Sequence, residues 1–242
     1  MKRLFVVILH YGPVSRTRSI HQQLLASDPF RKDEILVYDN ASPEPYAGAW
    51  MRSEHNLYWA GAFEHVMRTL ADQGASHVWF LNNDVTFVGP SGLVERAVLR
   101  LARAERLVGP VGVYSPAVTR NPYHPQMVAR KGGQFRLVRY VDGIAPLVNV
   151  EFWRKAGGID FEDNAYGYGV DVWFSSRAHE LGFACVVDHQ AVLRHNYHST
   201  AREVDGFMQK AAAAELRYLT QRLGAGYREA LAVMAADCRE LD

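Results

Sequence analysis

Three groups of polar residues follow apolar runs in the first third of the chain, and their side chains are of the kinds that bind metals and nucleotides. The runs are typical of buried strands and span residues 4–9, 34–38 and 78–81. The groups that follow them are His10-Tyr11-Gly12, Asp39-Asn40-Ala41-Ser42 and Asn82-Asn83-Asp84. Ligands bind beyond the carboxyl ends of strands in parallel α/β sheets, so we expect the groups to lie at one sheet edge. A turn or a helix N-cap explains Asp39 equally well.

Asp84 is the residue of the third group best suited to hold a divalent cation. The chain has no G-x-G-x-x-G after its first apolar run and no G-x-x-x-x-G-K-[ST], so a classical dinucleotide-binding or Walker-type loop is not expected. A bound diphosphate would therefore need a cation to balance its charge. Mg²⁺ and Mn²⁺ prefer oxygen ligands and often use one or two carboxylates together with phosphate oxygens. Asn82 would be a weaker or water-mediated neighbour.

Composition and patterning predict an α/β fold with a mainly parallel central sheet. The chain has 242 residues, of which 48% are hydrophobic, enough for one large domain with or without a small appendage. Strand-like runs, with a further one at 111–115, alternate with helical patterns at 19–26, 61–73 and 92–105. The second half is more mixed, with helices expected at 171–183, 202–223 and about 226–240. We expect one domain over 1–200, divided near 115, and a helical C-terminal extension over 201–242.

Charge and cysteine content limit the function classes. Lys plus Arg (27) nearly equals Asp plus Glu (26), and a net charge of +1 gives no electrostatic case for nucleic-acid binding. The two cysteines follow no metal spacing and suggest no disulfide framework, which fits a reducing compartment. The apolar run at 4–9 is too short for a signal sequence, and no run reaches the roughly 18 residues of a membrane span.

Six segments of the chain, in order, resemble the motifs of one enzyme family. They are "VVILHYG", "VYDNAS", "EHNLYWAGAFEHVM", "FLNNDV", "GGIDFEDNAYGYGVDVWFSSRAHELGF" and "VLRHNYHST". Together they are similar to inverting glycosyltransferases of family 2 with the GT-A fold, of the rhamnosyltransferase-like bacterial group, over roughly residues 3–200. The resemblance implies a hexosyl- or deoxyhexosyltransferase of surface polysaccharide biosynthesis, located in the cytoplasm or at the inner face of the membrane. It also implies a UDP-, dTDP- or GDP-sugar donor, Mg²⁺ or Mn²⁺, and a glycan or lipid-linked acceptor.

The resemblance also implies roles for particular residues. Asp39 would contact the base or ribose, Asp84 the metal and diphosphate, and His195 the metal or diphosphate, with His198 able to exchange roles with it. Residues 1–115 would then form the nucleotide-sugar half and 116–200 the acceptor half. The other residues expected at the nucleotide-sugar are His10, Tyr11, Asn40, Asn56, Gly61, Asn82 and Asn83. Acceptor contacts are expected from Asp142 and from Trp59 and Tyr166, because aromatic rings stack on sugars, although Trp and Tyr mostly pack in cores.

The sequence departs from the family at the catalytic base. Inversion needs a base that deprotonates the acceptor hydroxyl as it attacks the anomeric carbon. The family supplies it from E-D-x-D, whereas this chain has Tyr168-Gly169-Val170-Asp171 and keeps only the last carboxylate. We expect Asp171 to be the base, although an Asp at a helix start also stabilises the helix by about 0.5–2 kcal/mol without catalysis. Glu162, Asp163 and Asp142 are the nearby substitutes.

Two other functions remain open at the level of sequence. A non-catalytic module that binds a nucleotide-sugar or a glycan would explain the missing acidic pair. A sugar nucleotidyltransferase has a similar sheet, but the loop "HYGPVSRTRS" is poor in glycine for that activity. The helix at 202–223 has a partly apolar face that would pack on the domain or in a homodimer, or less simply rest on a membrane surface.

Overall fold

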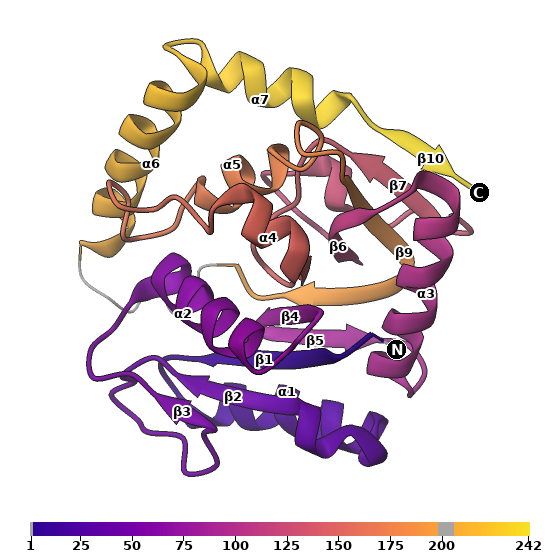
Figure 1. The fold of residues 1–242 in the computed structure, drawn as a ribbon. Helices are drawn as coiled ribbons and strands as arrows, with labels where there is room; N and C mark the ends of the chain where they lie inside the picture. The colour runs from indigo at the N-terminus through magenta and orange to yellow at the C-terminus, as the bar shows by residue number, and fades with distance from the viewer. Residues whose placement is uncertain (1, 198–205) are drawn as a thin grey trace.

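The computed structural model describes residues 2–197 and 206–242, which form one mixed α/β domain around a central sheet (Figure 1). Within these residues the strand order is β10-β7-β9-β6-β8-β4-β1-β2-β3, and β5 also pairs with β9. The strands are β1 (Leu4–His10), β2 (Ile35–Asp39), β3 (Met51–Arg52), β4 (His77–Asn82), β5 (Val85–Val88), β6 (Val111–Val118), β7 (Phe135–Val138), β8 (Leu147–Asn149), β9 (Ala184–His195) and β10 (Arg239–Leu241). The helices are α1 (Val14–Ser27), α2 (Tyr58–Asp72), α3 (Leu93–Val108), α4 (Val150–Ala156), α5 (Val170–Ser176), α6 (Phe207–Leu223) and α7 (Tyr227–Ala236), with short 3₁₀ turns at Pro29–Glu34 and Pro125–Met127.

The predicted α/β fold class is confirmed, but the sheet is mixed rather than mainly parallel, because parallel pairing is concentrated in its N-terminal part. Strands β3, β2, β1 and β4 are parallel to one another, as expected for strands linked through helices on the sheet faces. Beyond β4 the sheet is mixed, because β8 runs antiparallel between β4 and β6 while β6 and β9 are parallel. The short β8 leads directly into α4, with no loop between them.

Helices cover both faces of the sheet. Helices α1 and α3 contact each other on one face, and α2 and α4 contact each other on the other. The inner face of α2 is formed by Phe63, Val66, Met67 and Leu70, which are all fully buried. Helix α5 ends at Ser176, well before the predicted residue 183. Ser175 and Ser176 there donate to the carbonyls of Asp171 (2.7 Å) and Trp173 (2.8 Å), and such bonds disfavour helix interiors.

The C-terminal segment crosses the domain and returns to the sheet. Figure 1 shows α6 and α7 arching over the domain before β10 joins β7 and becomes the edge strand of the sheet. Of the predicted helix at 202–223, the structure describes α6 from residue 207. The segment expected as a helix over 226–240 forms α7 and then β10.

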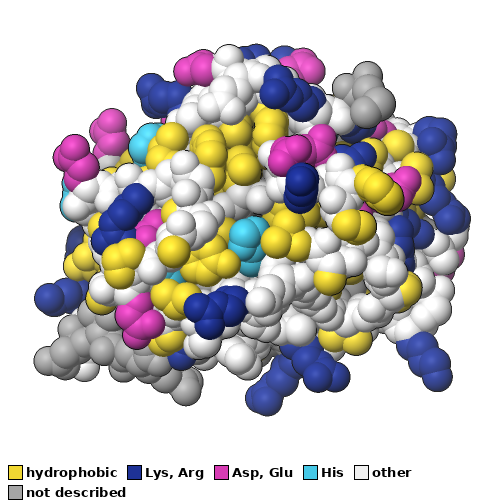
Figure 2. All heavy atoms as spheres, turned by 90° about the horizontal axis from the view of Figure 1, so that it is seen from below, with side chains coloured by type: hydrophobic (Ala, Val, Ile, Leu, Met, Phe, Trp, Pro, Cys, Tyr) yellow, Lys and Arg dark blue, Asp and Glu magenta, His cyan; other side chains and the backbone are white. Residues whose placement is uncertain are grey.

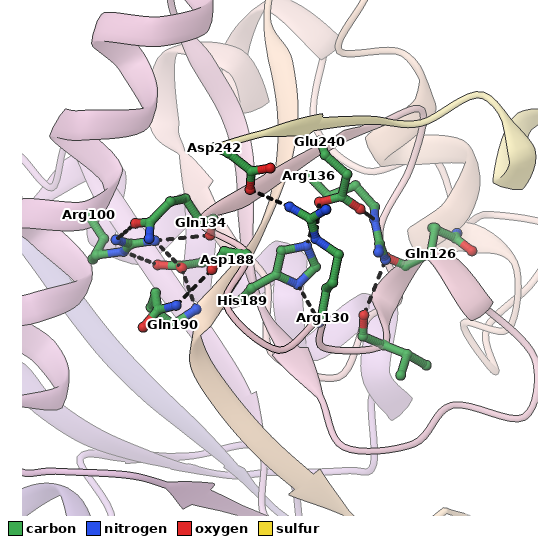
Figure 3. A network of polar contacts seen from close by, with 12 residues as sticks. Arg100, Gln126, Arg130, Gln134, Arg136, Asp188, His189, Gln190, Glu240 and Asp242 are labelled. Carbon is green, nitrogen blue, oxygen red and sulfur yellow. Dashed lines mark hydrogen bonds and ion pairs between the residues drawn. The ribbon is translucent and has the colours of Figure 1, made fainter.

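A network of polar contacts fixes β10 to the sheet (Figure 3). Glu240 accepts from Arg136 at 2.6 Å and from His189 Nε2 at 3.0 Å, and Arg130 pairs with Asp242. His189 Nδ1 accepts the Arg130 N–H, so the ring is neutral in this arrangement. Deeper in the network, the carboxylate of the buried Asp188 accepts two hydrogen bonds from the Arg100 guanidinium, at 2.6 and 2.8 Å.

The surface carries charges of both signs. Figure 2 shows the lower face, where Lys and Arg side chains are spread along the rim and hydrophobic and uncharged atoms lie between them. Within the described residues, no helix is both long and apolar enough to cross a bilayer. Cys185 is buried, which raises the pKa of its thiol to about 12, and Cys238 is exposed.

Candidate active site at the carboxyl ends of the parallel strands

A cavity of about 510 Å³ opens where the parallel strands end. The register pairs His10 with Asp39 and Leu9 with Asn82. The expectation that the three strand-end groups share one sheet edge is therefore confirmed. The residues expected at the site that line this cavity are Tyr11, Asn40, Asn56, Trp59, Asn82, Asn83, Asp84, Asp142, Tyr166, Asp171 and His195.

Three residues expected at the nucleotide-sugar lie outside the lining. His10 Nε2 donates to the Glu44 carbonyl at 2.6 Å, and its Nδ1 accepts from the Thr17 hydroxyl at 2.6 Å. Thr17 in turn accepts from Asn83 Nδ2 at 3.0 Å, so His10 supports a cavity residue from behind. Gly61 lies inside α2, where a Cβ would lie 3.1 Å from Leu57 Cβ.

Asp39 is the third of these residues, and its carboxylate is already bonded within the chain. Its Oδ1 accepts the Ser42 N–H at 2.9 Å, and its Oδ2 accepts the Tyr46 N–H at 3.0 Å and Arg52 Nη1 at 2.5 Å. The side chain is 1% exposed. In this arrangement Asp39 organises the turn after β2, and the base or ribose contact stays a prediction.

Asp84 and His195 meet at the carboxyl end of β4. Strand β5 pairs with β9 and sets Val85 opposite His195, so the two side chains face the same space, with His195 Nε2 3.1 Å from Asp84 Oδ1. Both are about nine-tenths buried, and His195 Nδ1 has no hydrogen-bond partner among residues 2–197 and 206–242. His198 lies outside the described residues.

Asp84 Oδ1 and His195 Nε2, 3.1 Å apart, would together hold a divalent cation that takes its other ligands from elsewhere. The described residues contain no group of three or more His, Cys, Asp or Glu placed to hold a metal by themselves. Phosphate oxygens would supply the remaining ligands, as they do in many Mg²⁺ sites.

Asp171 lines the same cavity, in the first turn of α5. Its Oδ2 accepts the Gly143 N–H at 2.6 Å. Burial, and then the negative charge of Asp142, raise the pKa of Asp171 to about 7, against the lowering effect of the Gly143 bond. Gly143 is required here for space, because a Cβ would lie 2.9 Å from Asp171 Oδ2 and 2.9 Å from the Trp59 ring. A carboxylate with that pKa is suited to accept a proton near neutral pH.

The other acidic residues considered as substitutes are placed differently. Asp142 lines the cavity and accepts from Asn121 Nδ2 at 2.8 Å. Asp163 pairs with Arg222 at 3.2 Å, outside the cavity lining, and Glu162 is exposed. Asp142 is therefore the one substitute that shares the cavity with Asp171.

Backbone strain accompanies the cavity wall between β2 and α2. Tyr58 has φ +53°, an uncommon conformation for an aromatic residue, and Ala41 has the same φ. Asn40 holds this wall, because its Nδ2 donates to Asn56 Oδ1 (2.9 Å) and to the Tyr58 carbonyl (3.1 Å). Its Oδ1 accepts the Leu57 N–H at 2.8 Å. Strained residues of this kind cluster at binding sites, where surrounding contacts hold them.

Sequence reasoning missed several lining residues, most of them contributed by α6 and by aromatic side chains. They include Tyr123, His124, Tyr168, Tyr197, Phe207, Met208 and Glu215. A signal was present for α6, because Met208, Ala212 and Glu215 have the i, i+4, i+7 spacing of one helix face. Nothing in the sequence indicated that this face turns toward the cavity.

Comparison with solved structures identifies the architecture. The structure of GalNAc-T7 with UDP, GalNAc and Mn²⁺ aligns with a TM-score of 0.57 at 13% identity, over 81% of this chain and 44% of that chain. This chain therefore spans less than half of that protein, and the likeness concerns the fold. The structure of A197 from STIV aligns with a TM-score of 0.47 at 15% identity, over 80% of this chain and 85% of that chain, which is a weaker likeness.

Sequence comparison finds relatives in mycobacteria. No protein-family model matches the chain. It is 30% identical over 200 residues to the uncharacterized protein Rv1525 of Mycobacterium tuberculosis (strain H37Rv), which covers 79% of this chain and 76% of that protein. The uncharacterized protein Mb1552 of Mycobacterium bovis gives the same values. The chain, a mixed α/β domain that resembles the GT-A fold, therefore belongs to the same family as these mycobacterial proteins.

Proposed function

We propose that the protein is a metal-dependent inverting glycosyltransferase of the family 2 type. It transfers a sugar from a nucleoside-diphosphate sugar to a glycan or lipid-linked glycan, in bacterial surface polysaccharide synthesis. The observation that carries this proposal is one cavity lined by two unlike acidic groups. They are the Asp84–His195 pair and Asp171, whose pKa is raised to about 7. GalNAc-T7, whose fold this chain resembles, was crystallised with UDP, GalNAc and Mn²⁺, and the proposal brings the same ligand classes here.

The donor would lie across the strand ends. Tyr11, Asn40 and Asn82 line that part of the cavity and offer hydrogen bonds to ribose and phosphate oxygens. The cavity also contains Asp84, Asp142 and Asp171, whose negative charges oppose a diphosphate. Mg²⁺ or Mn²⁺ held by Asp84 and His195 would offset that repulsion and neutralise the charge of the leaving nucleoside diphosphate.

The acceptor would approach from the side of Asp171. The Asp171 carboxylate takes the proton of the acceptor hydroxyl while the hydroxyl oxygen forms the bond to the anomeric carbon. The bond between that carbon and the diphosphate oxygen breaks on the opposite side, which inverts the configuration. The Gly143 N–H holds the carboxylate in place at 2.6 Å, and Trp59 and Tyr166 offer ring faces for the sugars.

The test is a panel of UDP-, dTDP- and GDP-sugars with Mn²⁺, read first by thermal shift and then by nucleotide release with candidate acceptors. A donor that binds raises the melting temperature by mass action. We expect Asp171→Asn to bind the donor but to lose at least about a hundredfold in turnover, since general bases contribute roughly 10²–10⁴. A loss below about tenfold would remove Asp171 from the role of base.

The same panel distinguishes the other two functions. Donor binding without release or transfer for any acceptor would favour a non-catalytic binding module. Formation of a nucleotide-sugar from a nucleoside triphosphate and a sugar phosphate would favour a nucleotidyltransferase. The cytoplasmic location, the contact of α6 with a membrane or a second copy, and the division of the chain near residue 200 are further parts of the proposal.

A further inference from the structure

Helix α6 forms the wall of the cavity beside Asp171. Its residues Phe207, Met208, Ala212 and Glu215 line the same cavity as Asp171. The helix is docked firmly, because the Tyr218 hydroxyl donates to the Asp160 carbonyl at 2.6 Å. One turn on, Arg222 reaches the Asp160 carboxylate at 2.7 Å. Glu215 is therefore held in the cavity wall by a packed helix.

Glu215 lies against the turn that starts α5. A Cβ on Gly169 would lie 3.3 Å from Glu215 Cγ and 3.0 Å from Leu219. Residue 169, which lacks a side chain, is two positions before Asp171. A larger side chain at that position would collide with α6, and Glu215 brings a carboxylate into the space beside it.

Charges around Asp171 and Glu215 show how the two groups act on each other. Asp142 and, more weakly, Glu215 raise the pKa of Asp171, in addition to burial. Burial raises the pKa of Glu215 itself, and Arg228 on α7 lowers it. Asp171 also acts on three tyrosines around this end, Tyr140, Tyr168 and Tyr218. Negative charge therefore dominates the part of the cavity around Asp171. The same charge would repel a negatively charged ligand there.

An aromatic surface completes this end. The Phe207 ring lies 5.5 Å from that of Tyr166, 6.0 Å from that of Tyr58 and 6.1 Å from that of Tyr168. Ring faces beside hydrogen-bond acceptors suit a sugar, whose C–H face packs on aromatics while its hydroxyls donate to carboxylates. The carboxylates of Asp142, Asp171 and Glu215, which line this part of the cavity, disfavour binding of a sugar that carries its own negative charge.

We propose that Glu215 is a specificity-determining residue: its carboxylate accepts a hydrogen bond from a neutral sugar, next to the hydroxyl that faces Asp171, and repels sugars bearing a carboxylate or phosphate. In the transfer reaction this sugar is the acceptor, so the inference rests on the proposed function and adds the acceptor's charge class to it. Glu215 contributes through binding, and Asp171 remains the base.

The test compares binding of methyl glucoside, galactoside and mannoside with that of their methyl uronides at pH 8, by saturation-transfer NMR without donor. Each pair differs only in a CH₂OH or COO⁻ group. We expect the wild type to bind at least one neutral glycoside about tenfold or more tightly than its uronide. Glu215→Gln should lower the ratio of the affinity for the neutral glycoside to the affinity for its uronide at least about fivefold. Glu215→Asp should leave this ratio unchanged. Glu229→Gln, an exposed site on α7, is the charge-matched control.

An unchanged ratio in Glu215→Gln, a wild type that prefers the uronides, or no binding of any neutral glycoside would overturn the inference. Circular dichroism confirms that each variant is folded, and Glu215→Asp supplies a second variant with the charge retained. Because no donor is present, the outcome is separate from that of the transfer assay. Discrimination through Glu215 without any transferase activity would contradict the proposed function alone, and transfer with an unaltered acceptor preference in Glu215→Gln would contradict this inference alone.

Discussion

At the scale of single residues, the cavity sets two acidic side chains to different tasks. Asp84 is paired with an imidazole at 3.1 Å, whereas backbone N–H groups, of Gly143 and Val172, offset the burial and the acidic neighbours of Asp171. The first arrangement suits a carboxylate that would share a cation with the imidazole. The second favours a carboxylate that exchanges a proton near neutral pH.

The raised pKa of Asp171 predicts how stability depends on pH. The folded protein binds this proton more tightly than the unfolded chain, so the stabilising contribution is complete below about pH 4 and is lost as the pH rises through about 7. Asp171→Asn removes the buried charge while an amide oxygen still accepts from Gly143. We expect this variant to melt about 4–8 °C above the wild type at pH 8, for roughly 2 kcal/mol, and little above it at pH 5. Equal differences at both pH values would contradict the assignment.

Asp84 gives a prediction about cation affinity that does not depend on turnover. Asp84→Asn keeps the shape of the side chain but removes the charge opposite His195. We expect the affinity for Mn²⁺ in the presence of UDP, measured by electron paramagnetic resonance, to fall at least about tenfold. Asp72→Asn, at an exposed position at the end of α2, is the control. An unchanged dissociation constant in Asp84→Asn would move the cation site elsewhere.

At the scale of elements, Asn40 joins the end of β2 to the start of α2. Its amide donates to two acceptors and accepts a third bond from the Leu57 N–H. These bonds hold Tyr58 at φ +53°, a conformation that costs about 1–2 kcal/mol for an ordinary residue. Asn40 therefore holds the wall of the cavity at Tyr58 together with Asn56, whose Oδ1 accepts the Tyr58 N–H at 2.7 Å.

Asn40→Asp should break this junction. The substitution sets a carboxylate oxygen against Asn56 Oδ1 and the Tyr58 carbonyl, where the native amide donates. We expect a loss of about 1–3 kcal/mol in the free energy of unfolding, measured by urea titration with an unchanged slope. Nucleotide affinity should fall with it, because Asn40 lines the cavity. A change within about 0.5 kcal/mol would mean that the junction is held by other contacts.

At the scale of the whole molecule, β10 secures the C-terminal segment through ionic contacts. Glu240 contacts Arg136 and the buried His189 (Figure 3). Burial lowers the pKa of His189 and Glu240 partly restores it, so the contribution of this histidine to stability is complete above about pH 6.5 and is lost as the pH falls below that value.

Glu240→Gln should therefore make the protein more sensitive to acid. Arg136 and His189 bond to different oxygens of Glu240, so the single oxygen of Gln replaces only one of these acceptors. Gln also no longer stabilises the charged imidazole. We expect the difference in melting temperature from the wild type to be larger at pH 5.5 than at pH 7.5, since Asp171 is common to both proteins and cancels. Glu229→Gln should show no such trend, and a pH-independent difference in Glu240→Gln would exclude the His189 contact as its cause.

The parts of the molecule that follow from sequence are those with local causes. Apolar runs ending in Asp39 and Asn82 predicted strands and their common edge, because strand burial and parallel pairing are visible as patterns. The internal bonding of Asp39 was not predictable, since its donors come from an irregular loop whose path no periodicity records. The position of Glu215 depends on how α6 docks on a segment far away in the chain. Long-range packing of this kind leaves no local signal.

The lining of the cavity comes from distant parts of the chain, and this has a consequence for biosynthesis. The ends of the parallel strands lie within the residues up to Asp84, whereas Phe207, which contacts Tyr58 and Tyr166, belongs to α6. At a translation rate of about 5–20 residues per second, the interval is roughly ten seconds. The contact of the Tyr58 ring with Phe207 therefore forms only after α6 has been made, well after the strands that the ring lies beside.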